Sequence, residues 1–313
     1  MANISKTYVG VDISKNTLDI CIYPKKMLLK IDNSGLAIKS FIKELAKHDV
    51  AQIACEATGG YEKQLAITLK KHGYDLWIVD PRRIRGYIIS TGCKSKNDKI
   101  DALKIAEFCS KNTKDYLAVE KTDNQEKLQA LVNRKNDLTK FLAAEKTRLK
   151  HPSHEMNKPS IKRLCKILGA EIRTVEKQIK KLIEVDANLS KKTKILESIP
   201  GIGQASAALL LSHVPELGMI SNNKIAALVG LCPYDNESGK SKGKRKIRGG
   251  RITPRNHLYM CALTTIKYNL TLKAFYDRLI GKQKTFKVAI VAVMRKLIIL
   301  ANSLLKKGEL CKV

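Results

Sequence analysis

The sequence predicts an α/β domain at the front of the chain, a long antiparallel helical hairpin in the middle and a mostly α-helical region at the back. Three patterns carry this prediction. Short apolar runs alternate with helical patterns over residues 7–109, two long apolar repeats flank a proline-containing break at residues 151–160, and apolar helical stretches dominate after residue 195. With 44% hydrophobic residues, the 313-residue chain can bury a substantial core, which excludes wholesale disorder.

Three strands joined by tight connections open the front region. The runs at residues 7–13, 18–24 and 26–32 are rich in β-branched and apolar side chains and are separated by polar turns. We expect helices at residues 35–48, 61–73 and 97–109 and strands at 51–57 and 75–80, with the basic PRRIRGY segment, residues 81–87, as a connection. This order indicates a mixed sheet flanked by helices, and the ribonuclease-H-like fold is one fold that has it.

The middle region contains two apolar repeats with the 3-4 spacing of long helices. The repeated positions are Leu128, Leu131, Leu138, Leu142 and Leu149, then Leu168, Ile172, Val175, Ile179, Leu182 and Leu189. Two helices of about 28 residues, each spanning ~40 Å, would pack as an antiparallel coiled coil. Such a coiled coil would be an oligomerisation arm or a strut, although a plain intradomain hairpin fits the same pattern. The expected domains are therefore residues 1–118, 119–194 and 195–313.

The charge of the chain is strongly positive and unevenly distributed. There are 59 Lys and Arg against 29 Asp and Glu, for a formal net charge of +30. The net charge is +6 over residues 1–120, +10 over 121–194 and +14 over 195–313. A surplus of this size favours a polyanionic partner, and a generally basic soluble surface is the alternative.

The cysteine pattern and the apolar runs indicate a cytoplasmic protein. None of the eight cysteines forms a C-x-x-C pair, which argues against a zinc ribbon and against a disulfide framework. The N-terminal residues lack the apolar core of a signal peptide. The apolar run at residues 288–305 is split by Arg295 and Lys296, so we expect a buried helix and no membrane span.

Four acidic residues stand out in the front domain. Asp12 and Glu56 each lie near the end of an apolar strand, where a carboxylate is costly unless it is paired or bound to a cation. Asp98 and Asp101 are three positions apart at the start of a predicted helix, so they project from one face. Brought together by the sheet, the four carboxylates would suit Mg²⁺ or Mn²⁺, and a pair of such ions could clamp a scissile phosphate.

The two helix acids allow a simpler interpretation. Acidic residues in a first turn are favoured by the helix macrodipole, and Asp98 and Asp101 considered alone fit that role. Their combination with two acids at strand ends favours the metal site instead. Lys94, Lys96 and Lys99 surround them and are expected to hold a nucleic-acid backbone.

A glycine-rich basic loop follows in the back region, within residues 232–251. Its cations and those that follow it are Lys240, Lys242, Lys244, Arg245, Lys246, Arg248, Arg251 and Arg255. These side chains are expected to bind phosphates. Ser238, which precedes a glycine at the edge of the loop, could attack a phosphodiester if a base or a metal activates it. Ser241 is the rival, although its flanking lysines favour a phosphate contact.

A Pro-Gly-Ile-Gly turn at residues 200–203 enters an Ala- and Leu-rich helix. Glycines allow close approach of a phosphate to the backbone, and a helix N-terminus offers free N–H groups. The turn therefore fits half of a helix-hairpin-helix DNA contact and equally fits an ordinary turn before a core helix.

Taken in order, these motifs resemble the DEDD transposases, which are insertion-sequence recombinases related to the Piv DNA invertases. The resemblance rests on YVGVDISKNTLD, CEATGGYE, VDPRRIRGY, KSKNDKIDALKIAEF, IPGIGQASA, ALVGLCPY and ESGKSKGKRKIRGGR, and it covers nearly the whole chain. It implies a RuvC-like (ribonuclease-H-like) domain, a coiled coil and a C-terminal transposase domain. The family's four acids correspond to Asp12, Glu56, Asp98 and Asp101, and its catalytic serine corresponds to Ser238.

The resemblance also implies a mechanism and partners. The serine would form a covalent 5′ phosphoserine link to DNA while the acids hold Mg²⁺, with the serine of one subunit completing the acid site of another in a dimer or tetramer. Some members of the family, called bridge-RNA-guided recombinases, pair a structured non-coding RNA with the target and donor DNA. The expected partners are therefore the DNA ends of an element, its target, a guide RNA and further copies of the chain, in a nucleoid-associated cytoplasmic setting.

The sequence thus predicts a metal-dependent, site-specific DNA recombinase, with Arg82, Arg83 and Arg85 as further nucleic-acid contacts. Two alternatives remain. A metal-dependent nuclease or Holliday-junction resolvase would need the acids but not Ser238. A non-catalytic nucleic-acid-binding protein would need neither, and acids isolated in apolar strands argue against it.

Overall fold

The computed structural model describes residues 6–92, 98–112, 122–235, 237–238, 241–243 and 245–312. For residues 98–99, 237–238 and 241–242 it describes the backbone alone. Contacts divide the chain into two units, Met1–Ala118 and Val119–Val313.

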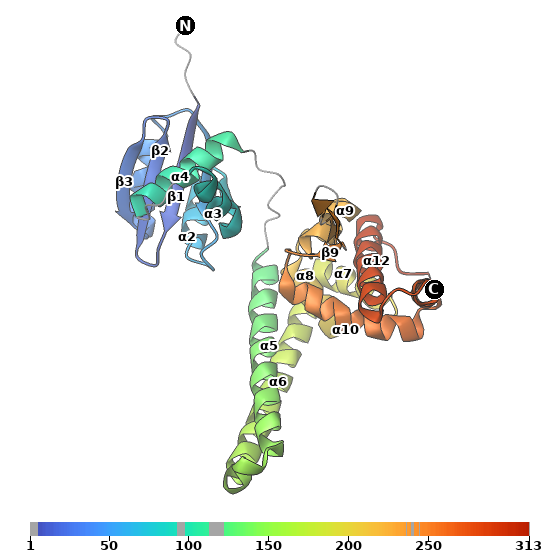
Figure 1. Ribbon diagram of the computed structural model, residues 1–313. Coiled ribbons are helices and arrows are strands. Elements are labelled where there is room, and N and C mark those ends of the chain that lie inside the picture. The colour runs from blue at the N-terminus through green and yellow to red at the C-terminus, as the bar shows by residue number, and fades with distance from the viewer. Residues whose placement is uncertain are drawn as a thin grey trace. The chain divides into compact units, whose positions relative to one another are not determined.

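The first unit is built on a five-stranded mixed sheet with the order β3-β2-β1-β4-β5 (Figure 1). The strands are β1 (Thr7–Ile13), β2 (Thr17–Tyr23), β3 (Met27–Asp32), β4 (Val50–Glu56) and β5 (Leu76–Val79). The first three pair antiparallel, whereas β4 lies parallel to β1 and β5 lies parallel to β4. The sheet has the mixed character that the sequence predicted.

Helices cover both faces of this sheet. Helices α1 (Gly35–Leu45) and α2 (Lys63–Lys71) pack on the face that carries Val9, Val11 and Ile13 of β1. Helices α3 (Pro81–Ser90) and α4 (Asp98–Lys111) pack on the opposite face, which carries the alternate residues. Because strand side chains alternate between faces, Asp12 and Glu56 belong to the side covered by α4.

The sequence patterns indicated a connection at residues 81–87 and did not predict helix α3. Its start is well specified, because Pro81 takes the first helical position and the Asp80 carboxylate accepts a hydrogen bond of 2.9 Å from the Arg82 N–H. Proline at the first position and aspartate at the N-cap are both favoured. The arginines at the start of this helix give no apolar 3-4 pattern, so the sequence did not indicate a helix there.

Gly10 brings α4 directly onto β1. A Cβ atom at residue 10 would lie 2.3 Å from both the Ala102 carbonyl oxygen and the Ala106 nitrogen. Cys21, the cross-strand partner of Gly10 on β2, is buried against the same two alanines. Small residues on both elements therefore fix the position of the helix that carries Asp98 and Asp101.

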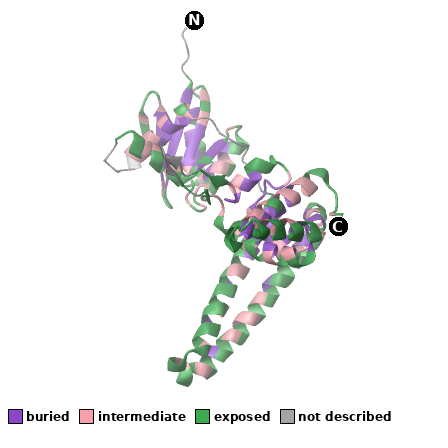
Figure 2. Cartoon of the chain, turned by 45° about the vertical axis from the view of Figure 1, so that its right-hand side comes forward, coloured by how far each residue is buried: buried purple, intermediate pink, exposed green. Residues whose placement is uncertain are grey.

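The second unit begins with a helical hairpin of α5 (Asp123–Lys150), a 3₁₀ turn (Pro152–Asn157) and α6 (Lys158–Val185), whose two arms run side by side in both views (Figures 1 and 2). A capping box between Thr122 and Gln125 starts α5. Away from its base, the hairpin is mostly exposed (Figure 2), with Phe141 56% and Ile167 59% accessible. The helical hairpin is confirmed, whereas its packing as a coiled coil stays a prediction.

The second helix of the hairpin ends earlier than the apolar repeat indicated. Asp186 accepts hydrogen bonds from the backbone N–H groups of Asn188 and Leu189 and thereby starts a new helix, α7 (Ala187–Glu197). Its other carboxylate oxygen accepts a 2.9 Å bond from the Asn124 side chain at the start of α5. A residue that interrupted the apolar pattern is therefore an N-cap that joins two helices.

The remaining helices are α8 (Gln204–His213), α9 (Asn222–Leu228), α10 (Ile252–Tyr268), α11 (Leu270–Gly281) and α12 (Phe286–Lys307). Helices α10 and α11 are separated at Asn269, whose side chain accepts a hydrogen bond from the Leu272 N–H and caps α11. Within the described chain, α12 alone is long and apolar enough to cross a membrane by composition. Its Ile290, Val293 and Leu297 are fully buried in the core of the second unit, which confirms the predicted buried helix.

One core joins the base of the hairpin to the C-terminal helices. It contains Leu128 and Val132 of α5, Val175 and Ile179 of α6, and the apolar faces of α8, α10 and α12. The division of this unit at residues 119–194 and 195–313 therefore remains a prediction.

Candidate active site and nucleic-acid interface

Asp12 and Glu56 lie at the same level of two adjacent parallel strands. Val11 of β1 is in register with Cys55 of β4, and the next residue of each strand is one of the two acids. Both carboxylates lie on the α4 side of the sheet and are partly buried. The carboxyl ends of neighbouring parallel strands thus bring together two of the four predicted acids.

A third acid, which the sequence interpretation missed, extends this row. Asp19 of β2 is the direct cross-strand partner of Asp12, and Lys30 of β3 is the partner of Asp19. The Lys30 Nζ lies 3.0 Å from a carboxylate oxygen of Asp19, whose side chain is only 8% exposed. Residues 56, 12, 19 and 30 therefore cross four strands at one level. In the sequence, the position of Asp19 within the apolar run LDICIY is the feature that could have identified it.

Helix α4 places its N-terminal end over the same edge of the sheet. Tyr8, at the start of β1, packs with Ile105 and Phe108 from the later part of α4, whereas Ala102 lies over Gly10. The helix therefore runs against β1, and its first turn lies toward the end of β1 where Asp12 is found. Asp101 is in that part of the helix and Asp98 is its first residue, although the Asp98 side chain lies outside the described residues.

The donors available at this edge are carboxylate oxygens. Among the side chains that the structure describes, no group of three or more His, Cys, Asp and Glu forms a ready-made metal cluster. Burial raises the pKa of Cys21 to about 11, and burial, followed by the charges of Glu62 and Glu56, raises the pKa of Cys55. Both thiols stay protonated at neutral pH, and Cys55 in addition faces α1 and α2 on the other side of the sheet. The donor set therefore fits a hard cation such as Mg²⁺ rather than a thiolate-bound metal.

The turn that follows Glu56 is held by Glu62. A Glu62 carboxylate oxygen accepts hydrogen bonds from the Gly60 N–H, at 2.9 Å, and from the Thr58 hydroxyl. Burial opposes ionisation of Glu62, but these hydrogen bonds prevail and lower its pKa. Gly59 and Gly60 take positive φ angles of 79° and 132°, which glycine adopts readily. The CEATGGYE motif thus combines a site acid with the turn that fixes it.

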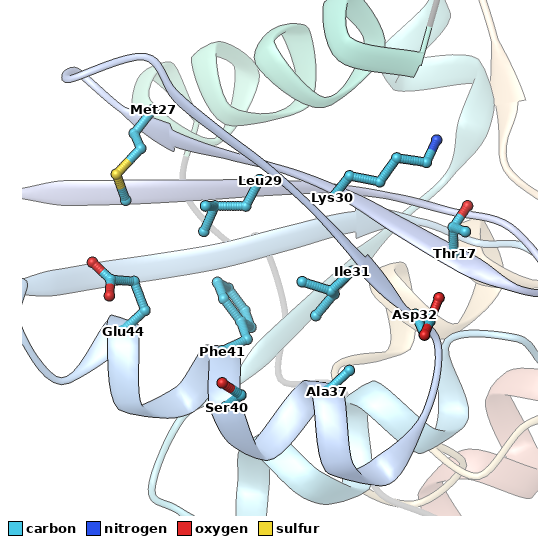
Figure 3. A pocket seen from close by; sticks show the side chains of 10 residues that line it. All are labelled: Thr17, Met27, Leu29, Lys30, Ile31, Asp32, Ala37, Ser40, Phe41 and Glu44. Carbon is cyan, nitrogen blue, oxygen red and sulfur yellow. The ribbon is translucent and has the colours of Figure 1, made fainter.

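A cavity of about 790 Å³ between β3 and α1 lies on the other face of the sheet (Figure 3). Met27, Leu29 and Ile31 point into it together with Phe41, whereas the Lys30 side chain extends away from them (Figure 3). The Lys30 amine pairs with Asp19 instead. This cavity is therefore separate from the row of acids.

The predicted arginine contacts of the front domain lie on α3. Arg82 pairs with Asp80 at 2.7 Å and is 72% exposed, and Arg85 is also exposed. Arg83 lies 5.5 Å above the rings of both Trp77 and Phe108. Lys94 and Lys96 are outside the described residues, as is the side chain of Lys99.

Ser238 lies on an arm of short paired strands. Strand β6 (Pro233–Tyr234) pairs antiparallel with β9 (Lys246–Ile247), and β7 (Glu237–Ser238) pairs with β8 (Ser241–Lys242). Ser238 and Ser241, the two rival nucleophiles of the sequence prediction, are direct cross-strand partners. Their positions along the arm therefore do not show which of the two serines is the nucleophile.

The base of this arm is closed by a crossing of glycine backbones. A Cβ atom at Gly250 would lie 2.2 Å from the Gly230 nitrogen, and one at Gly230 would lie 2.3 Å from the Gly249 carbonyl oxygen. All three glycines have positive φ angles near 70°. The motifs ALVGLCP and RGGR thus meet where the arm leaves and rejoins the helical core.

Two of the predicted cations maintain this base. Arg251 donates to both carboxylate oxygens of Glu216, at 2.6 and 2.7 Å, and to the His213 carbonyl. Arg255 donates to the Gly249 carbonyl at 2.8 Å. Because Glu216 is only 4% exposed, its pairing with Arg251 is required to offset the cost of burying the carboxylate.

The cations farther out on the arm are more accessible. Arg245 pairs with Asp235, Arg248 lies 5.4 Å over the ring of Tyr234, and Lys246 is exposed. Lys240 and Lys244 fall outside the described residues, as does the side chain of Lys242.

Comparison with protein families identifies both halves of the chain. Residues 9–152 match a model of DEDD transposases of the IS110 type, and residues 193–277 match a model described as the transposase IS116/IS110/IS902 family. The first match contains the acid row. The second contains the arm of strands β6 to β9 that carries Ser238, here called the serine arm. DEDD transposases generally depend on divalent metal ions.

Individual relatives agree with these matches. The pilin gene-inverting proteins of Moraxella lacunata and Moraxella bovis are each 29% identical over 316 residues, which covers 98% of both chains. The 43.6 kDa protein of insertion element IS110 from Streptomyces coelicolor is 26% identical over 152 residues, or 48% of this chain and 36% of the relative. On the combined evidence of acids, serine arm and relatives, the chain belongs to the IS110-family transposases and Piv-type recombinases, enzymes that act on DNA.

Proposed function

We propose that this protein is a metal-dependent, site-specific recombinase that joins itself covalently to DNA through Ser238. The observation that supports the acid site most strongly is the placement of Asp12 and Glu56 at one level, under the helix that carries Asp98 and Asp101. These four carboxylates would hold Mg²⁺ or Mn²⁺, which would supply charge stabilisation at the scissile phosphate.

In the proposed reaction, the Ser238 Oγ attacks a DNA phosphorus. The Ser238 hydroxyl loses its proton, a new Oγ–P bond forms, the P–O3′ bond breaks, and the leaving 3′ oxygen takes up a proton. The product is a 5′ phosphoserine with a free 3′ hydroxyl, which can reverse the reaction on another strand. Arg251 and Arg255 act as positioning residues because they hold the base of the arm, whereas Arg245, Lys246 and Arg248 are exposed and suited to phosphates.

The serine assignment is tested by trapping the adduct. Purified protein, Mg²⁺, DNA with the ends of its own element and RNA from the flanking non-coding region are mixed, denatured and examined for protein-linked DNA. We expect an adduct in wild type and in Ser241→Ala, but none in Ser238→Ala. The reverse pattern would transfer the role to Ser241. Cleavage without an adduct in any of these proteins would support the nuclease or resolvase alternative.

Two omissions test the remaining requirements. Chelation of divalent ions is expected to abolish the adduct, because the four proposed carboxylate ligands then lack their cation. Added Mg²⁺ is expected to restore it. Leaving out the RNA tests the proposed guide, since base identity in RNA-guided systems is read largely by pairing. Full activity without RNA would remove the guide from the proposal.

The proposed tetramer, in which one subunit's serine serves another subunit's acids, is tested by mixing two inactive variants. Asp12→Ala keeps the serine and Ser238→Ala keeps the acids. If the site is assembled from two subunits, the mixture should regain part of the strand exchange that each variant lacks. A mixture that stays inactive, although both variants bind DNA and co-assemble, would place both parts of each site in one subunit.

A further inference from the structure

A cavity of about 510 Å³ opens in the second unit, where the hairpin meets the C-terminal helices. It is lined by residues of α5, α6, α8 and α10. The charged lining residues are Lys135, Arg173, Glu176, Lys177 and Lys180. Four cations face one carboxylate, so the cavity has a net positive charge.

Three of these cations form a stripe along α6. Arg173, Lys177 and Lys180 follow the 3-4 spacing that places residues on one helix face, and all three are exposed. Glu176 is engaged by Lys135 of α5 at 2.8 Å, so the single carboxylate is already neutralised. Lys180 also lies 3.9 Å from Glu184, an exposed pair that contributes little. The stripe therefore presents positive charge to an incoming anion.

The first turn of α8 adds the positive end of a helix. The N-cap is Gly203, which has no side chain to cap the turn, and Gln204 and Ala205 line the cavity. Helix N-termini with uncapped N–H groups favour anions. Beside this turn, His257 and the Ser206 hydroxyl form a 3.0 Å hydrogen bond. Burial, and then the charge of Lys135, lower the pKa of His257, so this pair is neutral at pH 7.

We propose that this cavity binds a backbone phosphate of nucleic acid, so that the base of the hairpin and α8 form a docking site distinct from the serine arm. The proposal rests on the proposed function for the presence of a nucleic acid, and it names a phosphodiester rather than a base. Apolar side chains at the back of the cavity, Val132, Ile179 and Leu209, strengthen such a contact because they exclude water.

The first test removes the stripe. The triple variant Arg173→Gln, Lys177→Gln and Lys180→Gln is compared with Lys162→Gln, Arg163→Gln and Lys166→Gln, which makes the same charge change at exposed positions of the same helix. Both are made in full-length Ser238→Ala protein, and binding of a fluorescent DNA duplex is measured by anisotropy against salt. We expect the cavity variant to lose roughly tenfold in affinity and about one unit of salt slope, with little change in the control. Equal losses in both variants would overturn the proposal.

The second test blocks the helix terminus without damage to the fold. Gly203 has φ −94° and ψ 176°, and a Cβ atom there meets nothing within 4 Å, so Gly203→Asp can cap α8. Helix stability should stay the same or rise, yet nucleic-acid binding should fall, whereas Gly203→Ala should bind normally. Unchanged binding by Gly203→Asp would contradict the proposal.

An RNA hairpin replaces the DNA duplex in a parallel series. A loss of affinity for DNA, for RNA or for both assigns the source of the phosphate, and no loss for either probe overturns the site. Because every protein in the series lacks Ser238, failure of the serine chemistry would leave these binding results unaffected.

Discussion

At the scale of single residues, the acid row combines three carboxylates and one amine on four adjacent strands. Lys30 neutralises Asp19 directly, and Asp19 lies opposite Asp12. The ion pair with Lys30 offsets the charge of Asp19 and so reduces its repulsion of the neighbouring Asp12. We infer that Asp19 is a positioning residue for Asp12, and its effect on the site should be measurable separately from the fold.

Asp19→Asn keeps the shape of the side chain and removes its charge. We expect strand exchange to fall by roughly 10–100-fold, as for outer residues of metal sites, together with a higher Mg²⁺ requirement. Asp32→Asn, an exposed aspartate on the next strand, is the matched control. Wild-type activity of Asp19→Asn at every Mg²⁺ concentration would remove Asp19 from the site.

At the residue level, a sequence singles out an acid where chemistry and local position are sufficient. Asp12 and Glu56 attract attention because each is a charge near the end of an apolar run. Asp19 has the same property, but its relation to Asp12 depends on the β1–β2 register, which a sequence does not state. The choice between Ser238 and Ser241 likewise needed the family resemblance, since both serines share one rung of the arm.

At the scale of elements, the contact between α4 and β1 depends on the absence of a side chain at residue 10. Gly10→Ala places a methyl group against backbone atoms of Ala102 and Ala106 that cannot move independently of the helix. We expect a loss of about 1–3 kcal/mol in the stability of the first unit, with loss of activity as the acids on α4 shift. Fluorescence of Trp77 during urea unfolding measures this change.

Gly86→Ala serves as the control for that experiment. Gly86 is an exposed residue inside α3, and a Cβ atom there meets nothing within 4 Å. The same glycine-to-alanine change should therefore stabilise the unit by about 0.5–1 kcal/mol. If the two variants moved stability in the same direction, the steric account of Gly10 would be wrong.

The junction of α6 and α7 gives a pH-dependent prediction. Hydrogen bonds from the Leu189 backbone N–H, the Asn124 side chain and the Asn188 backbone N–H lower the pKa of Asp186. Asp186→Ala should cost about 1 kcal/mol of unfolding free energy at pH 7. The pKa of Asp186 is lower in the folded state, so this contribution is complete above the unfolded value of about 4 and is lost as pH falls through the folded value.

Far-UV circular dichroism during urea unfolding at several pH values checks the Asp186 prediction. Ser221→Ala removes an uncharged N-cap from α9 in the same unit, so its cost should not vary in this way. A difference between wild type and Asp186→Ala that persists at low pH would show that the carboxylate charge is not the stabilising feature.

The elements predicted from sequence differ from the observed ones where an N-cap residue starts a helix that the apolar pattern does not indicate. The apolar spacing resumed at Leu189 after the interruption at Asp186, so the start of α7 was not predicted, and the arginines after Asp80 gave no apolar pattern for α3. In both cases an aspartate N-cap was the decisive local feature. The long strands and helices were predictable because alternation and 3-4 spacing persisted over many residues.

At the scale of the whole molecule, the two units have separate hydrophobic cores. The only tryptophan, Trp77, is buried in the first unit, whereas the second unit contains most of the long helices. Fluorescence therefore reports on the first unit, and circular dichroism is dominated by the second. We expect Gly10→Ala to shift the fluorescence transition while the main circular dichroism transition stays in place. Identical shifts by both probes would show that the units unfold together.

The crossing of Gly230 with Gly249 and Gly250 has a consequence for the evolution of the family. Because the chain leaves the helical core and returns to it at one point, the arm between these glycines is an insertion whose ends already meet. Lengthening such an insertion costs little, since the entropy of closure grows only with the logarithm of length. Selection can therefore exchange the whole arm, with the proposed nucleophile and the cations together, while the helical core stays unchanged.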